Sequence, residues 1–312
     1  MRMLVIGAGA MGCAAGGFMA KAGHEVTLVG RAGHIDAIRE RGLRITGIWG
    51  EHTVTNLSVR TDLSGLSAGD FDLILIAVKS YDTAAAAESA GPLLDANTLI
   101  CSYQNGLGNA ERIAAVAGWE RTIGARVIYG VRRPELGHIE VTVIANPSAL
   151  GVYRPEAPAD RVRAIAEAMD AAGLPTVYTD RIATMLWGKV AYNCALNPLS
   201  ALLGVPYGNL SQTEDTLAIM RDVIRELYEV AGAMGIALDP DTPEAYMDLL
   251  VNRLIPPTAA HYASMHEDFQ FKRRTEIDAL NGAICAYGKQ YAIPCPANTF
   301  LTRMIHAHEA LA

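Results

Sequence analysis

The glycine pattern Gly7-x-Gly9-x-x-Gly12 constrains the fold more than any other feature of this chain. It interrupts an uncharged run from Met3 to Ala20 that could otherwise be read as a signal peptide or a membrane span. A membrane helix needs about 20 mainly apolar residues and a signal peptide a compact apolar block of roughly 7–15, so the glycines argue against both. A turn between a strand and a helix explains the run better.

The neighbouring elements give this pattern the context that dinucleotide binding requires. We expect a strand over Met3–Ile6, a helix over Met11–Ala22 and a second strand over Glu25–Val29. In such a turn the first glycine permits the bend, the second lets the backbone approach a pyrophosphate, and the third lets helix and strand pack closely. An ordinary glycine turn is the alternative reading of this segment, which comprises Gly7, Ala8, Gly9, Ala10, Met11 and Gly12.

Strand and helix signals alternate through the first half of the chain, as in a doubly wound sheet. The apolar run Phe71–Val78 is typical of a parallel strand buried on both faces. Further strands are expected over Thr98–Ser102, Thr122–Tyr129 and Thr176–Tyr178, a helix over Asp160–Ala172, and a hairpin or edge pair over Ile139–Ile144 and Ala149–Tyr153.

Long helical patterns replace this alternation after about Asp180. They cover Ile182–Leu203, Thr213–Met234, Pro243–Arg253 and Arg273–Lys289. Because a single hydrophobic core tends to stop growing at about 250–300 residues, a chain of 312 residues is expected to form two domains. We predict an α/β protein with a Rossmann-type doubly wound sheet over residues 1–179, which binds NADP, and an all-helical substrate and catalytic domain over residues 180–312.

Composition excludes several classes of protein. The net charge of −7 argues against a generally basic nucleic-acid binder, and no other stretch is apolar and long enough to span a membrane. The five cysteines are scattered and lack metal-ligand spacing, which predicts no metal site and a reducing, cytoplasmic setting. The expected partner is a small molecule; a homodimer is compatible with the sequence, which does not determine the oligomeric state.

Two cations follow predicted strands at the edge where such sheets bind ligands. The second strand ends in Val29-Gly30-Arg31, without the acid that would repel a 2′-phosphate, and a guanidinium there favours NADPH over NADH. Arg31 could instead be a solvated turn residue. Lys79 ends the run Phe71–Val78 and is well placed for a phosphate or carboxylate.

A polar stripe marks the first long helix, where Lys189, Asn193 and Asn197 are spaced i, i+4 and i+8 among apolar residues. A buried stripe of this kind needs partners, although a solvated face is the alternative. Pro198 is expected to kink or end the helix just past Asn197. Asn105 lies in an Asn-Gly pair, which is first a turn signal and secondly a candidate to bind nicotinamide ribose or substrate.

A second polar cluster lies further along the chain. Ser264 with Glu267 has the pattern of a capping box, so Ser264 could be a plain N-cap, and Thr275 with Asp278 resembles another. Glu276 precedes apolar residues and is expected to face inward, where the lysine and asparagine stripe could neutralise it.

These segments together resemble the ketopantoate reductase (2-dehydropantoate 2-reductase) family over nearly the whole chain. The matching segments are GAGAMG at Gly7–Gly12, Arg31, AVKSYDT at Ala77–Thr83, QNGLGN at Gln104–Asn109, KVAYNCALNPLSALLG at Lys189–Gly204 and RRTEIDALNG at Arg273–Gly282. The resemblance implies a Rossmann domain joined to an all-helical domain, and NADPH-dependent reduction of 2-dehydropantoate to pantoate for pantothenate and coenzyme A synthesis.

The resemblance also implies roles for individual residues. Lys189 would be the general acid, and Glu276 would fix the active-site network and a substrate hydroxyl. A lysine suits proton donation better than an arginine, which cannot release its proton at useful pH. The carboxylate and hydroxyl groups of the substrate would be held by Asn193, Asn197 and Ser264; Asn105 would lie between nicotinamide and substrate; and the 2′-phosphate end of NADPH would be bound by Arg31 and Lys79.

The chain departs from the family between residues 124 and 153, where VIANPSALGVY places Asn146-Pro147 instead of the expected glycines. This departure leaves the identity of the keto acid open. A reductase of another 2-oxo acid and a non-catalytic NADP-binding sensor therefore remain as alternatives. A 3-hydroxyacid or glycerol-phosphate dehydrogenase is disfavoured because no Gly-Gly pair precedes a lysine at helical spacing.

Overall fold

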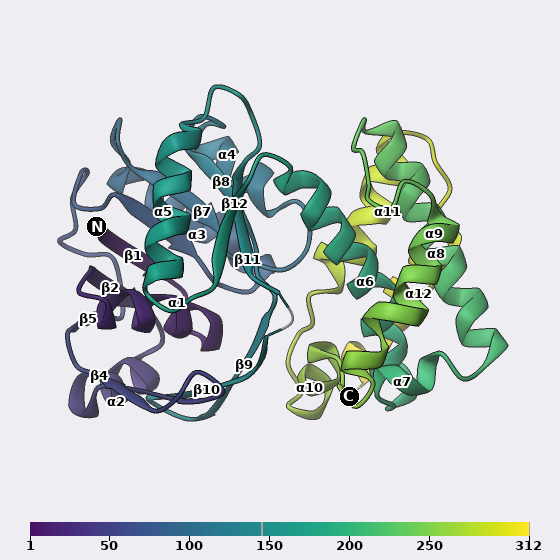
Figure 1. The fold of residues 1–312 in the computed structure, drawn as a ribbon, viewed down its shortest axis with the longest axis horizontal. Coiled ribbons are helices and arrows are strands. Elements are labelled where there is room, and N and C mark those ends of the chain that lie inside the picture. The colour runs from purple at the N-terminus through teal and green to yellow at the C-terminus, as the bar shows by residue number, and fades with distance from the viewer. Residues whose placement is uncertain (145, 312) are drawn as a thin grey trace. The chain divides into compact units, whose positions relative to one another are not determined.

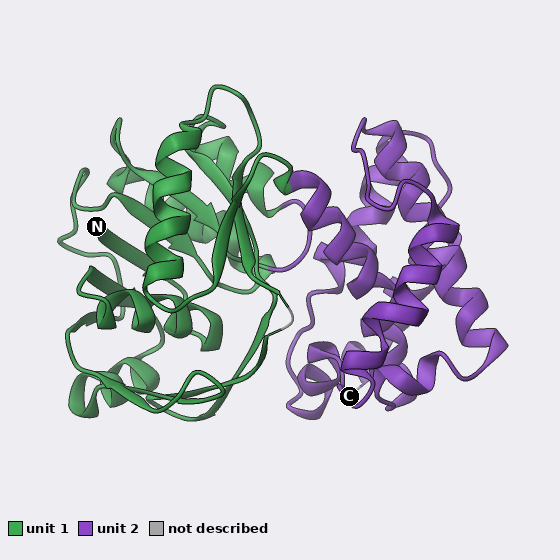
Figure 2. Cartoon of the chain, in the orientation of Figure 1, with its two compact units in different colours: residues 1–104, 109–182 green, residues 105–108, 183–312 purple. Residues whose placement is uncertain are grey.

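The computed structural model describes residues 1–144 and 146–311. Ala145, in the divergent segment, and Ala312, at the end of the predicted second domain, lie outside the described residues. The chain divides into two compact units: unit 1 is Met1–Gln104 with Asn109–Ile182, and unit 2 is Asn105–Gly108 with Ala183–Ala312 (Figure 2). The sequence-based division at residues 179 and 180 did not single out Asn105–Gly108, which interrupts unit 1 and belongs to unit 2.

The main sheet of unit 1 has eight strands in the order β12-β11-β8-β7-β6-β1-β2-β5 (Figure 1). Its strands β5, β2, β1, β6, β7 and β8 are parallel and follow the order of a Rossmann sheet. The predicted fold class is thus confirmed. The bounds are β1 Arg2–Ile6, β2 Glu25–Val29, β5 Leu57–Arg60, β6 Leu73–Ile76, β7 Leu99–Ser102, β8 Thr122–Arg126, β11 Ser148–Val152 and β12 Thr176–Thr179.

A second sheet of unit 1 has four strands in the order β4-β3-β10-β9, with bounds β3 Leu43–Gly47, β4 His52–Val54, β9 Tyr129–Glu135 and β10 His138–Ile144. The expected pairing of Ile139–Ile144 with Ala149–Tyr153 is wrong. Strand β10 pairs with β9 and β3, whereas β11 pairs with β8 and β12 in the main sheet. Alternating apolar residues identify a strand but not its partner, which distant segments determine. The single strand expected over Thr122–Tyr129 is likewise divided between the two sheets.

Helices cover both faces of the main sheet in unit 1 (Figure 1). On one face α1 Ala10–Lys21 and α5 Ala159–Ala171 pack over Met3 and Val5, and on the other α3 Thr83–Ala90 and α4 Asn109–Ala117 pack over Leu4 and Ile6. Successive residues of β1 therefore enter two different cores, as expected for a strand buried on both faces. The remaining helix of this unit is α2 Ala32–Arg41.

Unit 2 contains helices and no strand among its described residues. Its helices are α6 Ile182–Leu203, which starts at the last residue of unit 1, α7 Tyr207–Leu210, α8 Glu214–Ala233, α9 Pro243–Leu249 with a π-helical turn Leu250–Leu254, α10 Ser264–Gln270, α11 Asn281–Gln290 and α12 Pro296–Leu311. Thr213, the predicted start of α8, caps that helix by accepting a hydrogen bond from the N–H of Thr216.

The helix predicted over Ile182–Leu203 is confirmed as α6. It does not end just past Asn197, because Pro198 removes only one backbone donor and the helix continues to Leu203. The helix expected over Arg273–Lys289 begins only at Asn281. The residues before it form an irregular segment and a short 3-10 turn, Ile277–Ala279, and the N–H of Thr275 donates to the carboxylate of Glu309 instead of a helical carbonyl.

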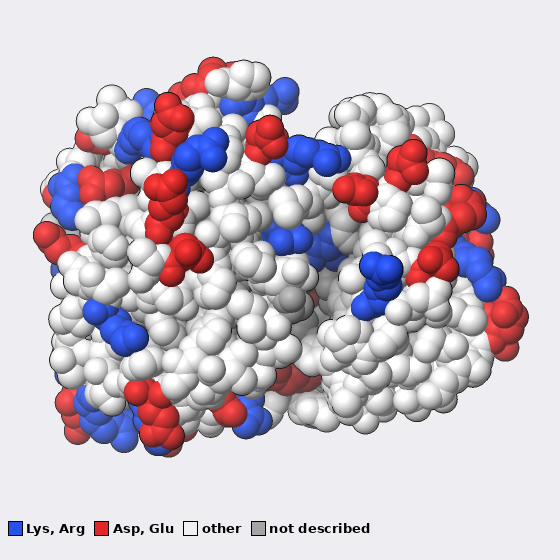
Figure 3. All heavy atoms as spheres, in the orientation of Figure 1, with Lys and Arg blue, Asp and Glu red and all other residues white. Residues whose placement is uncertain are grey.

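The described helices include none that is both long and apolar enough to cross a membrane. Acidic and basic side chains are interspersed on the face of unit 1 seen in Figure 3. Charge on that face therefore forms no extended surface of one sign.

Candidate functional site

Each glycine of the Gly7–Gly12 turn has a distinct steric surrounding. Gly7 has a φ of 108°, and a Cβ atom there would lie 2.6 Å from the backbone of Ala77 and Val78. A Cβ on Gly12 would lie 2.2 Å from the carbonyl oxygen of Gly7. A Cβ on Gly9, in contrast, would meet nothing within 4 Å. Two of the glycines thus allow close packing, and the third borders open space.

The same turn fits a dinucleotide phosphate. The N–H groups of Gly7 and Ala8 donate to the carbonyl of Val29, at 3.0 and 2.9 Å, which fixes the turn to the end of β2. Helix α1 begins directly after Gly9, so its first N–H groups lack helical acceptors and favour an anion. These features agree with a bound pyrophosphate.

The two predicted phosphate cations lie in loops that follow β2 and β6. Arg31 is the exposed N-cap residue of α2, two positions after β2 ends. Lys79 is half-buried and precedes the 3-10 turn Ser80–Asp82, three positions after β6 ends. Both residues therefore lie at the carboxyl edge of the parallel sheet, where ligands bind in this fold.

A buried polar network fixes the Lys79 loop. The side-chain amide of Gln104 donates to the carbonyl of Val78 at 2.9 Å and to the hydroxyl of Thr83 at 2.8 Å. The hydroxyl of Thr83 also lies within hydrogen-bond distance of the Ser80 carbonyl and the Asn109 side chain. This role of Thr83, Gln104 and Asn109 was not predicted, although all three belong to the segments AVKSYDT and QNGLGN.

The four residues Asn105–Gly108 pack within unit 2. The N–H of Leu107 donates to the carbonyl of Ala279 at 2.8 Å. Gly106 has a φ of 86°, and a Cβ there would lie 2.4 Å from the same carbonyl oxygen. The Asn-Gly pair is therefore a turn, as its composition predicts, and the turn places Asn105 in the pocket of unit 2.

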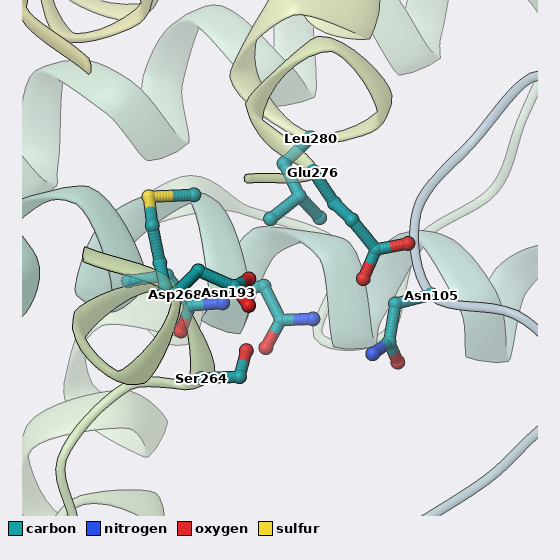
Figure 4. A pocket seen from close by; sticks show the side chains of 8 residues that line it. Asn105, Asn193, Ser264, Asp268, Glu276 and Leu280 are labelled. Carbon is teal, nitrogen blue, oxygen red and sulfur yellow. The ribbon is translucent and has the colours of Figure 1, made fainter. Parts of the chain in front are cut away.

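Unit 2 contains a pocket in which five predicted residues meet. Its lining comes from the Asn105 turn, from α6, from α10 and from the segment before α11, and consists of Asn105, Asn193, Asn197, Ser264, Met265, Asp268, Glu276 and Leu280. In Figure 4 the Glu276 carboxylate extends toward the side of the pocket where Asn105 lies, and the Ser264 hydroxyl points toward Asn193. Four separate stretches of chain thus supply one polar pocket.

The polar stripe Lys189, Asn193 and Asn197 on α6 is largely buried and is not a solvated face. Asn193 is 9% exposed and Asn197 is 5% exposed. The half-buried Lys189 donates from Nζ to the side-chain oxygen of Asn105 at 2.7 Å. The side-chain oxygen of Asn197 accepts from the hydroxyl of Tyr207 at 2.7 Å, which leaves its amide NH₂ as the group able to donate to a ligand.

Ser264 is not the N-cap of α10. Ala263 occupies that position without a side-chain cap, and Ser264 is the first helical residue, exposed and directed at the pocket. The second expected capping box is also wrong, because the Thr275 hydroxyl accepts from the N–H of Ile277 at 3.3 Å and starts no α-helix. The start of α10 depends on backbone geometry instead, so the Ser264 hydroxyl is not used as a cap.

Asp268 is the main pocket residue that the sequence analysis missed. Its carboxylate is 3% exposed and lies 3.0 Å from Nε of Arg273. The backbone N–H of Arg273 also donates to the backbone carbonyl of Asp268 at 2.8 Å. The signal was present, because Asp268 follows Ser264 by four residues on one helix and so shares its face. The two apolar lining residues, Met265 and Leu280, gave no comparable signal.

The assembled groups can bind and protonate an anionic carbonyl compound. Amide and hydroxyl groups supply donors for a carboxylate, and the Lys189 ammonium can donate a proton. Asp268 and Glu276 supply acceptors for hydroxyl groups. Among the described residues, no group of three or more His, Cys, Asp or Glu side chains is arranged to hold a metal ion.

A Rossmann sheet with a glycine turn, joined in one chain to a helical unit with this pocket, defines an oxidoreductase of the nicotinamide-dependent class. The chain belongs to the ketopantoate reductase family. Family models described as ketopantoate reductase PanE/ApbA and as its C-terminal part match residues 3–153 and 181–309. A 2-dehydropantoate 2-reductase of Aquifex aeolicus is 36% identical, with 99% of this chain and 97% of that protein covered.

Solved structures agree with this family. A PanE/ApbA family ketopantoate reductase from Ralstonia eutropha JMP134 superposes with a TM-score of 0.89 at 34% identity, covering 99% of both chains. D-mandelate dehydrogenase in complex with NADH and anilino(oxo)acetate superposes with a TM-score of 0.88 at 25% identity, covering 99% of this chain and 98% of that one. The shared architecture therefore includes a protein with a different substrate and with NADH.

Proposed function

We propose that this protein is a cytoplasmic enzyme that reduces 2-dehydropantoate to pantoate with NADPH, in pantothenate and coenzyme A synthesis. The observation that carries the proposal is the unit 2 pocket, which gathers Asn105, Asn193, Asn197, Ser264 and Glu276, while Asn105 binds the ammonium of Lys189. The relatives that match the whole chain under the name 2-dehydropantoate 2-reductase support the same reaction.

The cofactor proposal rests on unit 1. The Gly7–Gly12 turn and the start of α1 would hold the pyrophosphate, and Arg31 and Lys79 would hold the 2′-phosphate. When bound, NADPH supplies the hydride that is added to the C2 carbonyl carbon. Arg31 stands where an NAD-binding protein of this fold carries an acidic residue, so NADPH is favoured although D-mandelate dehydrogenase holds NADH.

Lys189 has the central role in the proposed chemistry. As the C2 carbonyl becomes an alkoxide, its oxygen needs a proton and a nearby positive charge, and the ammonium of Lys189 supplies both. The Lys189 amine then regains a proton from water. Asn105 keeps the ammonium in place by accepting its 2.7 Å hydrogen bond.

The remaining pocket residues would bind and orient the substrate. The amide of Asn197, whose oxygen Tyr207 occupies, offers its NH₂ to the substrate carboxylate, and Asn193 and Ser264 offer further donors. Glu276 accepts a hydrogen bond from the substrate hydroxyl and fixes the network around Lys189. Asp268 shares the face of Ser264 on α10, and its ion pair with Arg273 reduces the repulsion between its carboxylate and that of the substrate.

The polarity of the lining favours a hydroxylated keto acid over an aromatic one. Six of the eight lining residues are polar or charged, and only Met265 and Leu280 are apolar. An aromatic ring beside Asp268 or Glu276 would offer these carboxylates no hydrogen-bond donor and would remove polar surface from water, which is unfavourable. 2-Dehydropantoate carries a hydroxyl that can donate to such an acceptor.

A substrate panel tests the proposal directly. Purified protein is mixed with NADPH and either 2-dehydropantoate, 2-oxo-3-methylbutanoate, which lacks the hydroxyl, or phenylglyoxylate, and the loss of NADPH absorbance is followed. We expect kcat/KM to be highest for 2-dehydropantoate. A preference for another keto acid would identify a related reductase, and NADPH binding without any turnover would favour the sensor.

A further inference from the structure

Pro198 leaves a backbone carbonyl of α6 without its helical donor. In an α-helix the N–H of residue 198 would bond to the carbonyl of residue 194, but proline has no N–H. Cys194 is fully buried and lies between Asn193 and Asn197, the two amides that line the pocket. A buried carbonyl needs a donor from elsewhere, because water cannot supply one there.

Asn281 supplies that donor from another part of the chain. Its side-chain Nδ2 lies 3.1 Å from the carbonyl oxygen of Cys194, and the same NH₂ group donates to the side-chain oxygen of Asn298 at 3.0 Å. Asn281 itself is fully buried. One side-chain amide therefore takes the place of the backbone N–H that Pro198 lacks.

The surrounding bonds fix which end of the Asn281 amide faces α6. The Glu226 carboxylate, which only accepts, is bound by the backbone N–H groups of Ala297 and Asn298 and by Nδ2 of Asn298, at 2.7, 3.0 and 2.7 Å. Asn298 thus presents its oxygen to Asn281, which must donate. The oxygen of Asn281 has no hydrogen-bond partner among the described residues, so the donor end of this amide makes all its hydrogen bonds.

Asn281 also ends the segment that carries Glu276. Glu276 and Leu280 line the pocket, and the carbonyl of Ala279 holds the Asn105 turn through Leu107. The contact of Asn281 with Cys194 therefore joins this segment to α6 at the level of Asn193 and Asn197. It is a buried hydrogen bond between the segment that carries Glu276 and the helix that carries Asn193 and Asn197.

We propose that Asn281 is a positioning residue for the substrate pocket, which replaces the missing N–H of Pro198 and thereby fixes the Glu276 turn on α6 beside Asn193 and Asn197. The effect on substrate binding rests on the proposed function, whereas the replacement of the N–H does not. Asn281 does not touch the substrate, and its role is to keep the lining groups in register.

The test is a cycle of Asn281→Leu, Pro198→Ala and the double variant. Leucine has a similar size but no hydrogen-bond donor. We expect Asn281→Leu to raise the KM for 2-dehydropantoate about tenfold or more, because the loss of one buried hydrogen bond lets the lining residues of the pocket shift. The KM for NADPH should stay within about twofold. Pro198→Ala restores a backbone N–H for Cys194 but not the link between α6 and the Glu276 segment, so the double variant should recover most of the lost stability and keep the raised KM.

Tyr246→Phe is the matched control, because Tyr246 on α9 also donates from its side chain to a backbone carbonyl of α6. The Tyr246 hydroxyl donates to the carbonyl of Gly188 on α6 at 2.6 Å, but this carbonyl faces no proline four residues later. The effect of Tyr246→Phe should therefore add to that of Pro198→Ala, without rescue. The proposal is overturned if the double variant with Asn281→Leu is no more stable than Asn281→Leu alone, if its KM returns to the wild-type value, or if Pro198→Ala rescues the stability of Tyr246→Phe equally.

Unfolding measurements separate this proposal from the proposed function. If the wild-type protein reduces no 2-oxo acid, the proposed function is refuted, and the variants are compared by their thermal unfolding midpoints alone. We expect Asn281→Leu to lower the midpoint by on the order of 3 °C when Pro198 is present and by clearly less in the Pro198→Ala background. Equal shifts in both backgrounds refute the replacement of the N–H. If Asn281→Leu fails to fold, folding of the double variant supports the proposal and its failure refutes it.

Discussion

The two units build their candidate binding sites from different materials. In unit 1 the Gly7–Gly12 turn is one continuous stretch whose useful groups are backbone N–H groups and open space. In unit 2 the pocket needs side chains from four separate stretches, held by bonds such as that between Lys189 and Asn105. A site made of backbone N–H groups depends on the absence of side chains from the turn. A site made of side chains depends on each contributing residue being present and correctly placed.

This difference predicts the largest effect at Lys189. Lys189→Ala removes the proton donor from unit 2, so we expect kcat to fall by about two orders of magnitude or more while NADPH binding to unit 1 is retained. Steady-state rates and NADPH titration by fluorescence measure the two quantities. Lys189→Arg is the matched control, because it keeps the charge but cannot release a proton, and it should not restore turnover. Near-normal turnover of Lys189→Ala would remove this residue from the mechanism.

Arg31 is the side chain on which unit 1 should depend most. Arg31→Asp replaces a cation with a group that repels a 2′-phosphate, so we expect the dissociation constant for NADPH to rise by roughly 10–100-fold. The dissociation constant for NADH should change little, since NADH has no 2′-phosphate. Parallel titrations with both cofactors measure this preference. An equal change for both would mean that Arg31 is only a solvated turn residue.

Gly9 and Gly12 test whether unit 1 is a backbone site. Gly12→Ala places a Cβ 2.2 Å from a backbone oxygen, so it should cost about 1–3 kcal/mol of stability and weaken NADPH binding as the turn shifts. Gly9→Ala has open space around its Cβ, so it should fold normally and lose NADPH affinity only if the cofactor occupies that space. Urea unfolding and NADPH titration of both variants check this. Normal NADPH affinity in Gly9→Ala would place the pyrophosphate elsewhere.

The sequence predicts the two kinds of site to different extents. The glycine turn can be predicted from the sequence because all the residues that it requires fall within six positions between a strand and a helix. The stripe of Lys189, Asn193 and Asn197 can be predicted because helical spacing puts the three residues on one face. Asp268 was missed although it follows Ser264 by four residues, because no local pattern distinguishes this buried acid from the exposed Glu267 beside it. The pairing of β10 with β3 depends on contacts between distant residues, which no local pattern contains.

Acid is expected to affect unit 1 through His34, with an effect that appears only below neutral pH. His34 is 2% exposed; the N–H of Gly137 donates to its Nδ1 at 2.9 Å, and its Nε2 lies 3.3 Å from Sγ of Cys13, just after the glycine turn. Burial, together with the smaller effect of the Arg133 charge, lowers the pKa of His34 to about 4. With Nδ1 accepting, Nε2 carries the proton, so the folded protein requires the neutral ring.

The sign of the pH dependence follows from this lowered pKa. An unfolded histidine titrates near 6.5, so the stability that neutral His34 contributes is complete above about pH 6.5 and is lost as the pH falls toward 4. One pKa unit corresponds to about 1.4 kcal/mol, so the loss should reach about 2–3 kcal/mol. His34→Asn keeps an acceptor for Gly137 and cannot titrate, so urea unfolding between pH 7 and pH 4 should show a shallower decline in this variant. Parallel declines would show that other groups, such as His261 in unit 2, whose pKa burial also lowers, control the acid sensitivity.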